Sequence, residues 1–191
     1  MPGPKGLLPY QKYSQLRIRH RGYMPHWELP GAAYSVTWRL ADSLPAHVEQ
    51  RLLDEKARGN EPLEQQLESE LHRLHGACYL LNARAAGIVA EALQHFADTR
   101  YRLFAWCVMP NHVHVLVEPF DDIHLHDLLH SWKSYTAKQI NKVLRRTGPV
   151  WAREYWDRII RDHRDLGTTT NYIAANPLNA GLTAWPWVSP K

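Results

Sequence analysis

The stretch CVMPNHVHVLVEP, residues 107–119, decides the fold, because it places two histidines inside a run of valine and leucine. Side chains of a β-strand alternate between its faces, so His112 and His114 point to one side and the valines beside them point to the other. The strand therefore buries one face in a core. Two imidazoles at positions i and i+2 can chelate one divalent ion, with a third ligand from elsewhere, or they can be two hydrogen-bonded histidines on a half-exposed face.

The segments around this strand predict an α+β fold. The short Pro-Asn connection at 110–111 favours an antiparallel hairpin with the preceding strand. Hydrophobic periodicity predicts, in chain order, strand 32–40, helix 82–96, strands 100–109 and 112–119, helix 125–146, strand 156–161 and helix 165–177. The simplest closure of this order is a ferredoxin-like sandwich, with a central antiparallel sheet that carries the histidine strand and helices on one face.

Length and composition indicate one domain with an insertion. The 191 residues, of which 45% are hydrophobic, suffice for one well-buried core. Residues 1–30 hold several prolines and, up to Trp27, basic side chains without an acidic one, which predicts a basic arm. A single domain is expected over 31–184, followed by a tail at 185–191. A charged helical hairpin at about 46–75 is expected beside the core, without a chemical role.

The cysteines and the N-terminus indicate a soluble, cytoplasmic protein. Cys78 and Cys107 lie far apart and form no CxxC motif, so neither a disulfide framework nor a cysteine zinc site is expected. No apolar run approaches the roughly 20 residues that cross a bilayer, and the start lacks the order of an export signal.

The charge pattern suggests a nucleic-acid partner. The net charge of +4 is unevenly distributed, and residues 133–164 combine basic side chains with aromatic rings. Cations can follow the phosphates of a single strand while rings stack on its bases, although a solvated helix face with core aromatics gives the same pattern. The candidate phosphate contacts are Arg17, Arg19, Arg21, Lys133, Lys138, Arg153, Arg158 and Arg161.

Four stretches together carry a family resemblance. They are MPNHVHVLVEP, SWKSYTAKQIN, GPVWAREYWDRIIRD and TNYIAANPLNAGL. Over residues 34–182 the chain resembles the REP-associated tyrosine transposases, which are relatives of the single-tyrosine HUH transposases of insertion sequences. The most specific parts are the histidine strand after Met-Pro-Asn and the ending with Tyr-Ile-x-x-Asn-Pro.

The resemblance implies a metal-dependent transposase and nickase. In that family the paired histidines bind Mg²⁺ or Mn²⁺ at the scissile phosphate of single-stranded DNA, and a tyrosine on the last helix attacks. The products are a 5′-phosphotyrosine link and a free 3′-hydroxyl, so the strand can be rejoined. Carried over, His112 and His114 are metal ligands and Tyr172 is the nucleophile. Asn176, one helical turn later, suits a third, oxygen-donating ligand.

The expected partner is single-stranded DNA with a hairpin from palindromic repeats, without a membrane or a small-molecule cofactor. A monomer is favoured over a homodimer, because the insertion and the aromatic C-terminus can cover a dimerisation edge.

Three alternatives remain open. Tyr135, in SWKSYTAKQIN, is a rival nucleophile. His112, His114 and Glu118 also match the His-x-His-x-x-x-Glu order of cupin metal enzymes, which would require a many-stranded barrel. A catalytically silent single-stranded nucleic-acid-binding protein of the same fold is the third.

Overall fold

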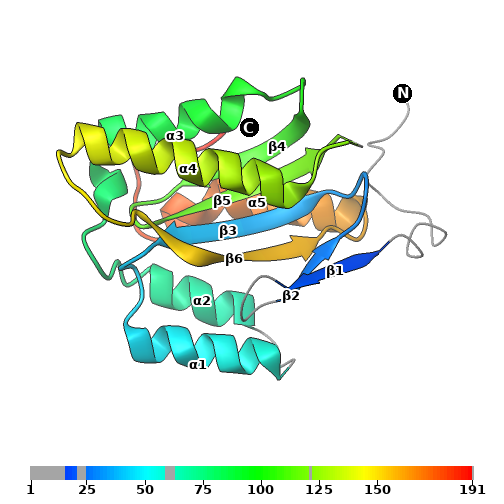
Figure 1. The fold of residues 1–191 in the computed structure, drawn as a ribbon, viewed down its shortest axis with the longest axis horizontal. Coiled ribbons are helices and arrows are strands. Elements are labelled where there is room, and N and C mark those ends of the chain that lie inside the picture. The colour runs from blue at the N-terminus through cyan, green and yellow to red at the C-terminus, as the bar shows by residue number, and fades with distance from the viewer. Residues whose placement is uncertain (1–15, 21–24, 59–62, 121, 191) are drawn as a thin grey trace.

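The computed structural model describes residues 16–20, 25–58, 63–120 and 122–190. Arg21 lies outside these residues. The elements, in chain order, are β1 (Arg17–His20), β2 (Pro25–Glu28), β3 (Tyr34–Leu40), α1 (Ala46–Ala57), α2 (Leu63–Leu71), a 3₁₀ turn (Tyr79–Leu81), α3 (Ala83–His95), β4 (Tyr101–Val108), β5 (His112–Pro119), α4 (Leu125–Val143), β6 (Trp151–Ile159) and α5 (His163–Asn179) (Figure 1).

The main sheet has the order β4-β5-β3-β6, and each neighbouring pair is antiparallel. Together with α3 and α4 as crossovers, this order gives the ferredoxin-like arrangement. The predicted α+β fold with a central antiparallel sheet is therefore confirmed, and the histidine strand is β5 in its interior. Thr37 of β3 lies opposite His114, and Arg39 lies opposite His112.

The helices cover both faces of the sheet, whereas the sequence predicted them on one face. Figure 1 shows α3 and α4 on one side and α5 on the other. The reason is that the histidine face of β4 and β5 also carries apolar side chains. Ala105, Cys107 and Leu116 form a buried cluster there with Ile173 of α5. The histidine face is thus partly a second core and partly a polar site.

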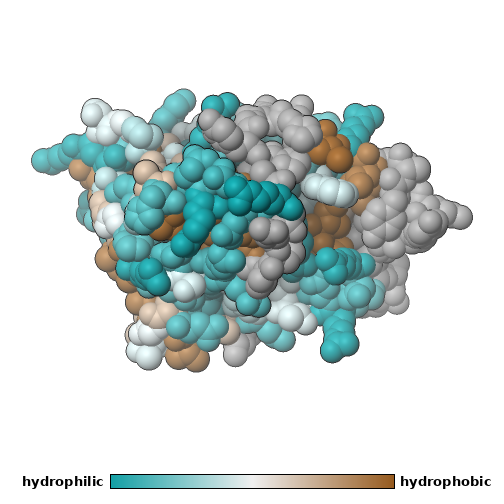
Figure 2. Space-filling view, turned by 90° about the horizontal axis from the view of Figure 1, so that it is seen from below, coloured by the Kyte–Doolittle hydropathy of each residue, from teal (hydrophilic) through white to brown (hydrophobic). Residues whose placement is uncertain are grey.

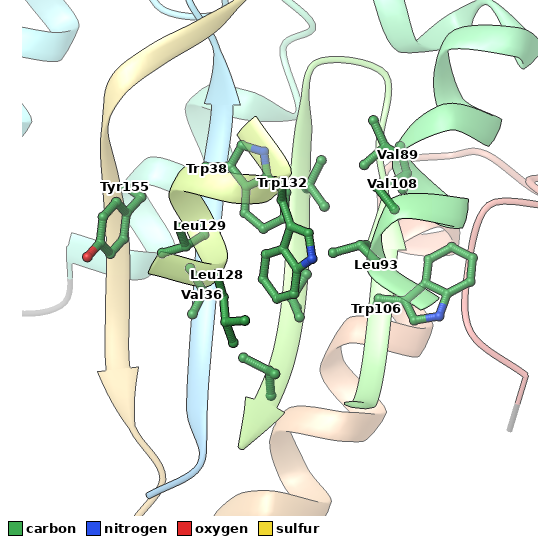
Figure 3. Close-up of a cluster of buried hydrophobic side chains, with 14 of the residues drawn as sticks. Val36, Trp38, Val89, Leu93, Trp106, Val108, Leu128, Leu129, Trp132 and Tyr155 are labelled. Atoms are coloured by element: carbon green, nitrogen blue, oxygen red, sulfur yellow. The ribbon is translucent and has the colours of Figure 1, made fainter. Parts of the chain in front are cut away.

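The larger core lies between the sheet and the helices α3 and α4 (Figure 3). Val113, Val115 and Val117 of β5 are fully buried in it, as the alternation of the strand predicted. Trp132 of α4 stacks on Trp38 of β3 with ring centroids 6.0 Å apart. This core fixes the strand and turns His112 and His114 to the opposite face.

Local signals explain the N-termini of α3 and α5, and α5 is longer than the sequence predicted. The side chain of Asn82 caps α3, because it accepts hydrogen bonds from the backbone N–H groups of Arg84 and Ala85. Asp162 caps α5, because its side chain accepts a hydrogen bond from the backbone N–H of Asp165. The helix also continues through Pro177 to Asn179, since a proline this close to the end removes only one helical hydrogen bond.

Two segments near the chain ends form pairings that the sequence did not predict. Part of the predicted arm forms a two-stranded sheet of β1 and β2, with β2 beside β6 and the side chain of His26 buried. The sequence missed it because Arg-Ile-Arg-His lacks an apolar alternation. At the other end, the backbone of Trp187 and Ser189 bonds to Val108 and Trp106, so the tail lies along the edge of β4. The domain boundaries at 30 and 184 remain predictions.

The predicted charged hairpin corresponds to α1 and α2. Their leucines, including Leu52, Leu67 and Leu71, form a small core with Trp156 of β6. Figure 2 views the molecule from below Figure 1, the side on which α1 and α2 lie, and hydrophilic residues cover much of this face. Both cysteines are free and buried. Within the described ranges, every helix is too short or too polar to cross a membrane.

Candidate active site

Three side chains from two distant segments meet on the histidine face of the sheet. His112 and His114 of β5 bring their Nε2 atoms to 2.9 Å from each other. Glu68 of α2 places its carboxylate oxygens 3.2 Å from Nε2 of His114 and 3.6 Å from Nε2 of His112. We call Glu68, His112 and His114 the strand cluster.

Hydrogen bonds on the far side of each ring fix the orientation of both imidazoles. Nδ1 of His114 lies 2.8 Å from Oγ1 of Thr37, and Nδ1 of His112 lies 2.7 Å from Oδ1 of Asn111. The side-chain amide of Asn111 donates to the carbonyl of Leu71 at 3.0 Å, which ties the strand to the end of α2. Both rings are thus held through Nδ1, and each Nε2 faces the carboxylate of Glu68.

The spacing of the strand cluster suits a divalent ion. Two ligands that each lie about 2.1 Å from one ion are about 3.0 Å apart at a right angle and about 3.4 Å apart in a tetrahedron. The distances of 2.9 to 3.6 Å between the three groups fall around these values. Two imidazoles and one carboxylate are thus a donor set that can hold a metal ion, and Thr37 and Asn111 hold the two rings in place.

The protonation states of the strand cluster favour binding of a cation. Burial lowers the pKa of His112 to about 4, so this imidazole is neutral at physiological pH. Burial alone raises the pKa of Glu68, but the charge of His114 and hydrogen bonds from the surrounding histidines outweigh it and hold this pKa below its usual range. His72, whose Nε2 lies 2.7 Å from Glu68, has a raised pKa because of that hydrogen bond. The site thus combines a neutral histidine with an ionised carboxylate.

Tyr172 and Asn176 lie on the face of α5 that adjoins the strand cluster. The ring centroids of Tyr172 and His114 are 5.9 Å apart, and Tyr172 is 41% exposed. Burial of its hydroxyl, then the charge of Glu68 and a hydrogen bond with it, raise the pKa of Tyr172. Asn176 is fully buried and donates to Glu68 at 2.7 Å, with its Oδ1 3.5 Å from Nε2 of His72. In this arrangement Asn176 holds Glu68 in place, and its role as a metal ligand stays a prediction.

A cavity of about 670 Å³ opens onto these groups. Such a volume lies within the roughly 300–1,000 Å³ of ligand-binding pockets, enough for a nucleotide. Thr37, Glu68, His114 and Tyr172 line it, as does Arg158. Arg158 bonds to Asp165 at 2.7 and 2.9 Å and to Thr169 at 3.0 Å, so its guanidinium is held at the wall of the cavity.

The other predicted DNA contacts lie elsewhere. Lys133 and Arg153 line a second cavity, of about 550 Å³, between α4 and β6. The ammonium of Lys133 donates to the carbonyls of Ala152 and Arg153, and burial lowers its pKa to about 8. Lys138 and Arg161 are exposed, and Arg17 and Arg19 lie on β1.

Two alternative residues are not part of the strand cluster. Tyr135 is exposed on α4, which packs through Trp132 on the opposite face of the sheet. Glu118 continues the histidine row of β5 but accepts a hydrogen bond from Arg102 at 3.2 Å. The sheet is open and four-stranded, so the barrel that a cupin requires is absent from the described residues.

The sequence analysis expected no chemical role for the charged hairpin, whereas the structure places Glu68 of α2 in the strand cluster. In the sequence, Glu68 could not be distinguished from the other acidic residues of a segment whose pattern predicts a solvent-exposed helix. The one available signal was the pair of Glu68 and His72, which stand one helical turn apart. Asn111 and Thr37 were also missed, because second-shell partners depend on tertiary packing.

Comparisons with known proteins give a consistent result. Residues 80–176 match the family model described as "Transposase IS200 like", which is half of the chain. These residues include both histidines, Tyr172 and Asn176, but not Glu68.

Individual relatives are more distant. A Haemophilus influenzae protein named as a REP-associated tyrosine transposase is 28% identical over 103 residues, covering 47% of this chain and 58% of the relative. The chain thus matches little more than half of that relative's length. The solved structure of a REP-associated tyrosine transposase bound to a REP hairpin has a TM-score of 0.52 and 19% identity, covering 89% of this chain and 80% of the other, which shows a shared fold. A Deinococcus radiodurans transposase structure has a TM-score of only 0.33 and 17% identity, over 83% of this chain and 96% of the other.

Proposed function

The chain belongs to the IS200-like transposase family, and from this premise we propose that it is a metal-dependent single-stranded DNA transposase that cleaves and rejoins DNA through Tyr172. The observation that carries this proposal is the convergence of His112, His114 and Glu68 beside Tyr172 at an open cavity. Hairpin DNA from palindromic repeats is the proposed substrate. Its support is that a protein of similar fold was solved bound to a REP hairpin.

We propose that His112, His114 and Glu68 hold Mg²⁺ or Mn²⁺, with Asn176 either as a further oxygen ligand or as the group that orients Glu68. When bound there, a divalent cation would supply positive charge at the scissile phosphate. The donor set supports this assignment, because both imidazoles offer Nε2 and both are held by hydrogen bonds through Nδ1.

Tyr172 is the proposed nucleophile. Its hydroxyl oxygen forms a bond to phosphorus while the bond from phosphorus to the 3′ oxygen breaks. The phenol proton leaves to water, and the departing 3′ oxygen takes up a proton. Because one phosphodiester replaces another, resealing by the reverse step needs no ATP. Burial and then the charge of Glu68 raise the pKa of Tyr172, so a bound cation that offsets the charge of Glu68 would favour loss of the phenol proton.

The predicted DNA contacts fall into two groups. Arg158, at the cavity wall, and Arg161, close to it in sequence, are proposed to contact the cleaved strand. The other candidates, Arg17, Arg19, Arg21, Lys133, Lys138 and Arg153, are proposed to contact DNA that flanks the cleavage site. Arg158 contacts Asp165 in the absence of DNA, so a phosphate has to compete with this carboxylate.

A monomer that acts in cis is the proposed assembly. Tyr172 lies beside His114 of its own chain, and the tail pairs with the edge of β4 that a second sheet would otherwise extend.

The test is covalent trapping on labelled single-stranded DNA that carries a palindromic hairpin. Wild type should form a denaturant-stable adduct with Mg²⁺ or Mn²⁺ and none with EDTA. Tyr172→Phe should abolish the adduct, while Tyr135→Phe, a matched tyrosine on the other face, should retain it. DNA binding without an adduct under any metal condition would support the catalytically silent binder instead.

A mixing experiment tests the cis arrangement. Tyr172→Phe and His114→Gln are each expected to be inactive, and an equimolar mixture should stay inactive if each site uses residues of one chain. Recovery of about a quarter or more of the wild-type adduct would contradict the monomer and indicate exchange of α5 between chains.

A further inference from the structure

A second group of two histidines and one glutamate lies where β5 leads into α4. His124 and His126 stand on either side of Leu125 at the start of α4, and Glu28 is the last residue of β2. Leu125 and His126 are buried, whereas His124 is exposed. We call Glu28, His124 and His126 the hairpin cluster, because Glu28 belongs to the β1–β2 hairpin.

The ligand atoms of the hairpin cluster converge. Nδ1 of His126 lies 2.7 Å from one carboxylate oxygen of Glu28, and Nδ1 of His124 lies 3.7 Å from the other. One donor atom from each of the three residues lies within 4.8 Å of the other two. Ligands of a tetrahedral zinc ion are about 3.4 Å apart, so a small movement of the exposed His124 would complete the geometry.

Asp127 lies behind the ring of His126, on the side away from Glu28. Nε2 of His126 lies 3.1 Å from a carboxylate oxygen of Asp127. A carboxylate behind a histidine fixes the tautomer and makes the opposite nitrogen a stronger ligand, which is the usual second shell of protein-bound zinc. His124 occupies the N-cap of α4, but its side chain makes no capping hydrogen bond. Its Nδ1 faces Glu28 instead.

We propose that Glu28, His124 and His126 form a zinc-type metal site, distinct from the strand cluster, that fastens the β1–β2 hairpin to the start of α4. Two imidazole nitrogens and one carboxylate oxygen match a zinc ion with an open fourth position. The strand cluster is near the start of β5, whereas the hairpin cluster follows its end. The strand is eight residues long, so at about 3.3 Å per residue the sites are separated by roughly 20 Å. One ion therefore cannot serve both.

The experiment strips the 191-residue chain with EDTA, removes the chelator by gel filtration and then measures the zinc bound per chain on titration with zinc. Glu28→Gln should lose one equivalent of zinc relative to wild type. His124→Gln, at an exposed position that folding tolerates, should weaken the same equivalent by more than the roughly 10–100-fold that second-shell changes cost. His130→Gln is the matched control, since His130 is an exposed histidine one turn further along α4, and it should bind like wild type.

The variant Glu68→Gln distinguishes zinc binding at the two clusters, because it removes a proposed ligand of the strand cluster only. In this background zinc should still raise the melting temperature, and the added change Glu28→Gln should abolish the rise. Equal zinc binding by wild type, Glu28→Gln and His124→Gln would overturn the proposal and leave the hairpin cluster as an ion pair. That result would not affect the proposed function of the strand cluster.

Discussion

The strand cluster and the hairpin cluster contain the same three functional groups in different settings. In each, two histidines flank one buried apolar residue, and a glutamate comes from a segment distant in sequence. The strand histidines are almost completely buried, whereas the side chain of His124 is 56% exposed.

Tyrosines beside the two clusters differ as well. Tyr172 lies beside His114 and is partly exposed, while the hydroxyl of Tyr34, near the hairpin cluster, exchanges hydrogen bonds with the backbone of Leu29 at 2.6 and 3.0 Å. The same three ligand types can therefore serve different functions, depending on the residues around them. A buried site with an available nucleophile suits catalysis, and a half-exposed site between two elements suits a structural link.

The largest expected difference between the clusters concerns DNA cleavage. Glu68→Gln removes the charged ligand of the strand cluster, and the rate of adduct formation should fall about 1,000-fold, since charge stabilisation by a metal contributes several kcal/mol. Glu28→Gln, the same change in the hairpin cluster, should alter the rate by less than about threefold. Single-turnover kinetics in Mn²⁺ measures both. An equal loss in the two variants would mean that both clusters act in catalysis.

The second prediction compares the residues behind the two sets of ligands. Asn111 is fully buried and bonds to both His112 and Leu71, so Asn111→Ala should cost about 2–3 kcal/mol of unfolding free energy. Asp127 is exposed, and Asp127→Asn should stay within about 0.5 kcal/mol of wild type. Urea unfolding of the metal-free proteins provides the comparison. A cost below about 1 kcal/mol for Asn111→Ala would show that water replaces its hydrogen bonds.

The sequence predicted the fold and part of the candidate site. The fold depends on local periodicity, whereas the choice of Tyr172 rests on the family resemblance. The alternation around His112 and His114 placed the valines in the core, and the spacing of Tyr172 and Asn176 placed both on one face of a helix. Both features hold in the structure.

The missing half comes from tertiary contacts that leave no periodic signal. Glu68 is one of several acidic residues in its segment, and only the packing of α2 beside β5 brings it to the histidines. The same holds for Glu28, in a segment whose prolines and arginines suggested an arm. His124 and His126 form a His-x-His pair like that of the strand, but they lie outside a strand, where alternation gives no prediction.

The third prediction is a pH dependence that belongs to the strand cluster alone. Burial lowers the pKa of His112 from 6.5 to about 4, so between these values the unfolded state binds a proton that the folded state does not. Stability of the metal-free protein should therefore fall as the pH decreases, by roughly 1–2 kcal/mol between pH 6.5 and 5. The raised pKa of His72 acts in a different window, since its stabilisation is complete below pH 6.5 and is lost above it.

Two variants isolate this contribution in urea unfolding at pH 6.5 and 5. His112→Gln should show a smaller acid-induced loss than wild type, because glutamine does not titrate. His124→Gln should keep the loss of wild type. If His112→Gln keeps the full loss, another group is responsible for the acid sensitivity.

The smallest expected effect tests whether the hairpin cluster depends on its own second shell. Asp127→Asn keeps the size of the side chain but replaces the carboxylate behind His126 with a neutral amide. The imidazole becomes a weaker base, so zinc affinity at the hairpin cluster should fall about tenfold. Competition with a chromophoric chelator in the Glu68→Gln background measures this site alone. Unchanged affinity would mean that His126 is oriented by Glu28 and helix packing, and that the carboxylate of Asp127 contributes only surface charge.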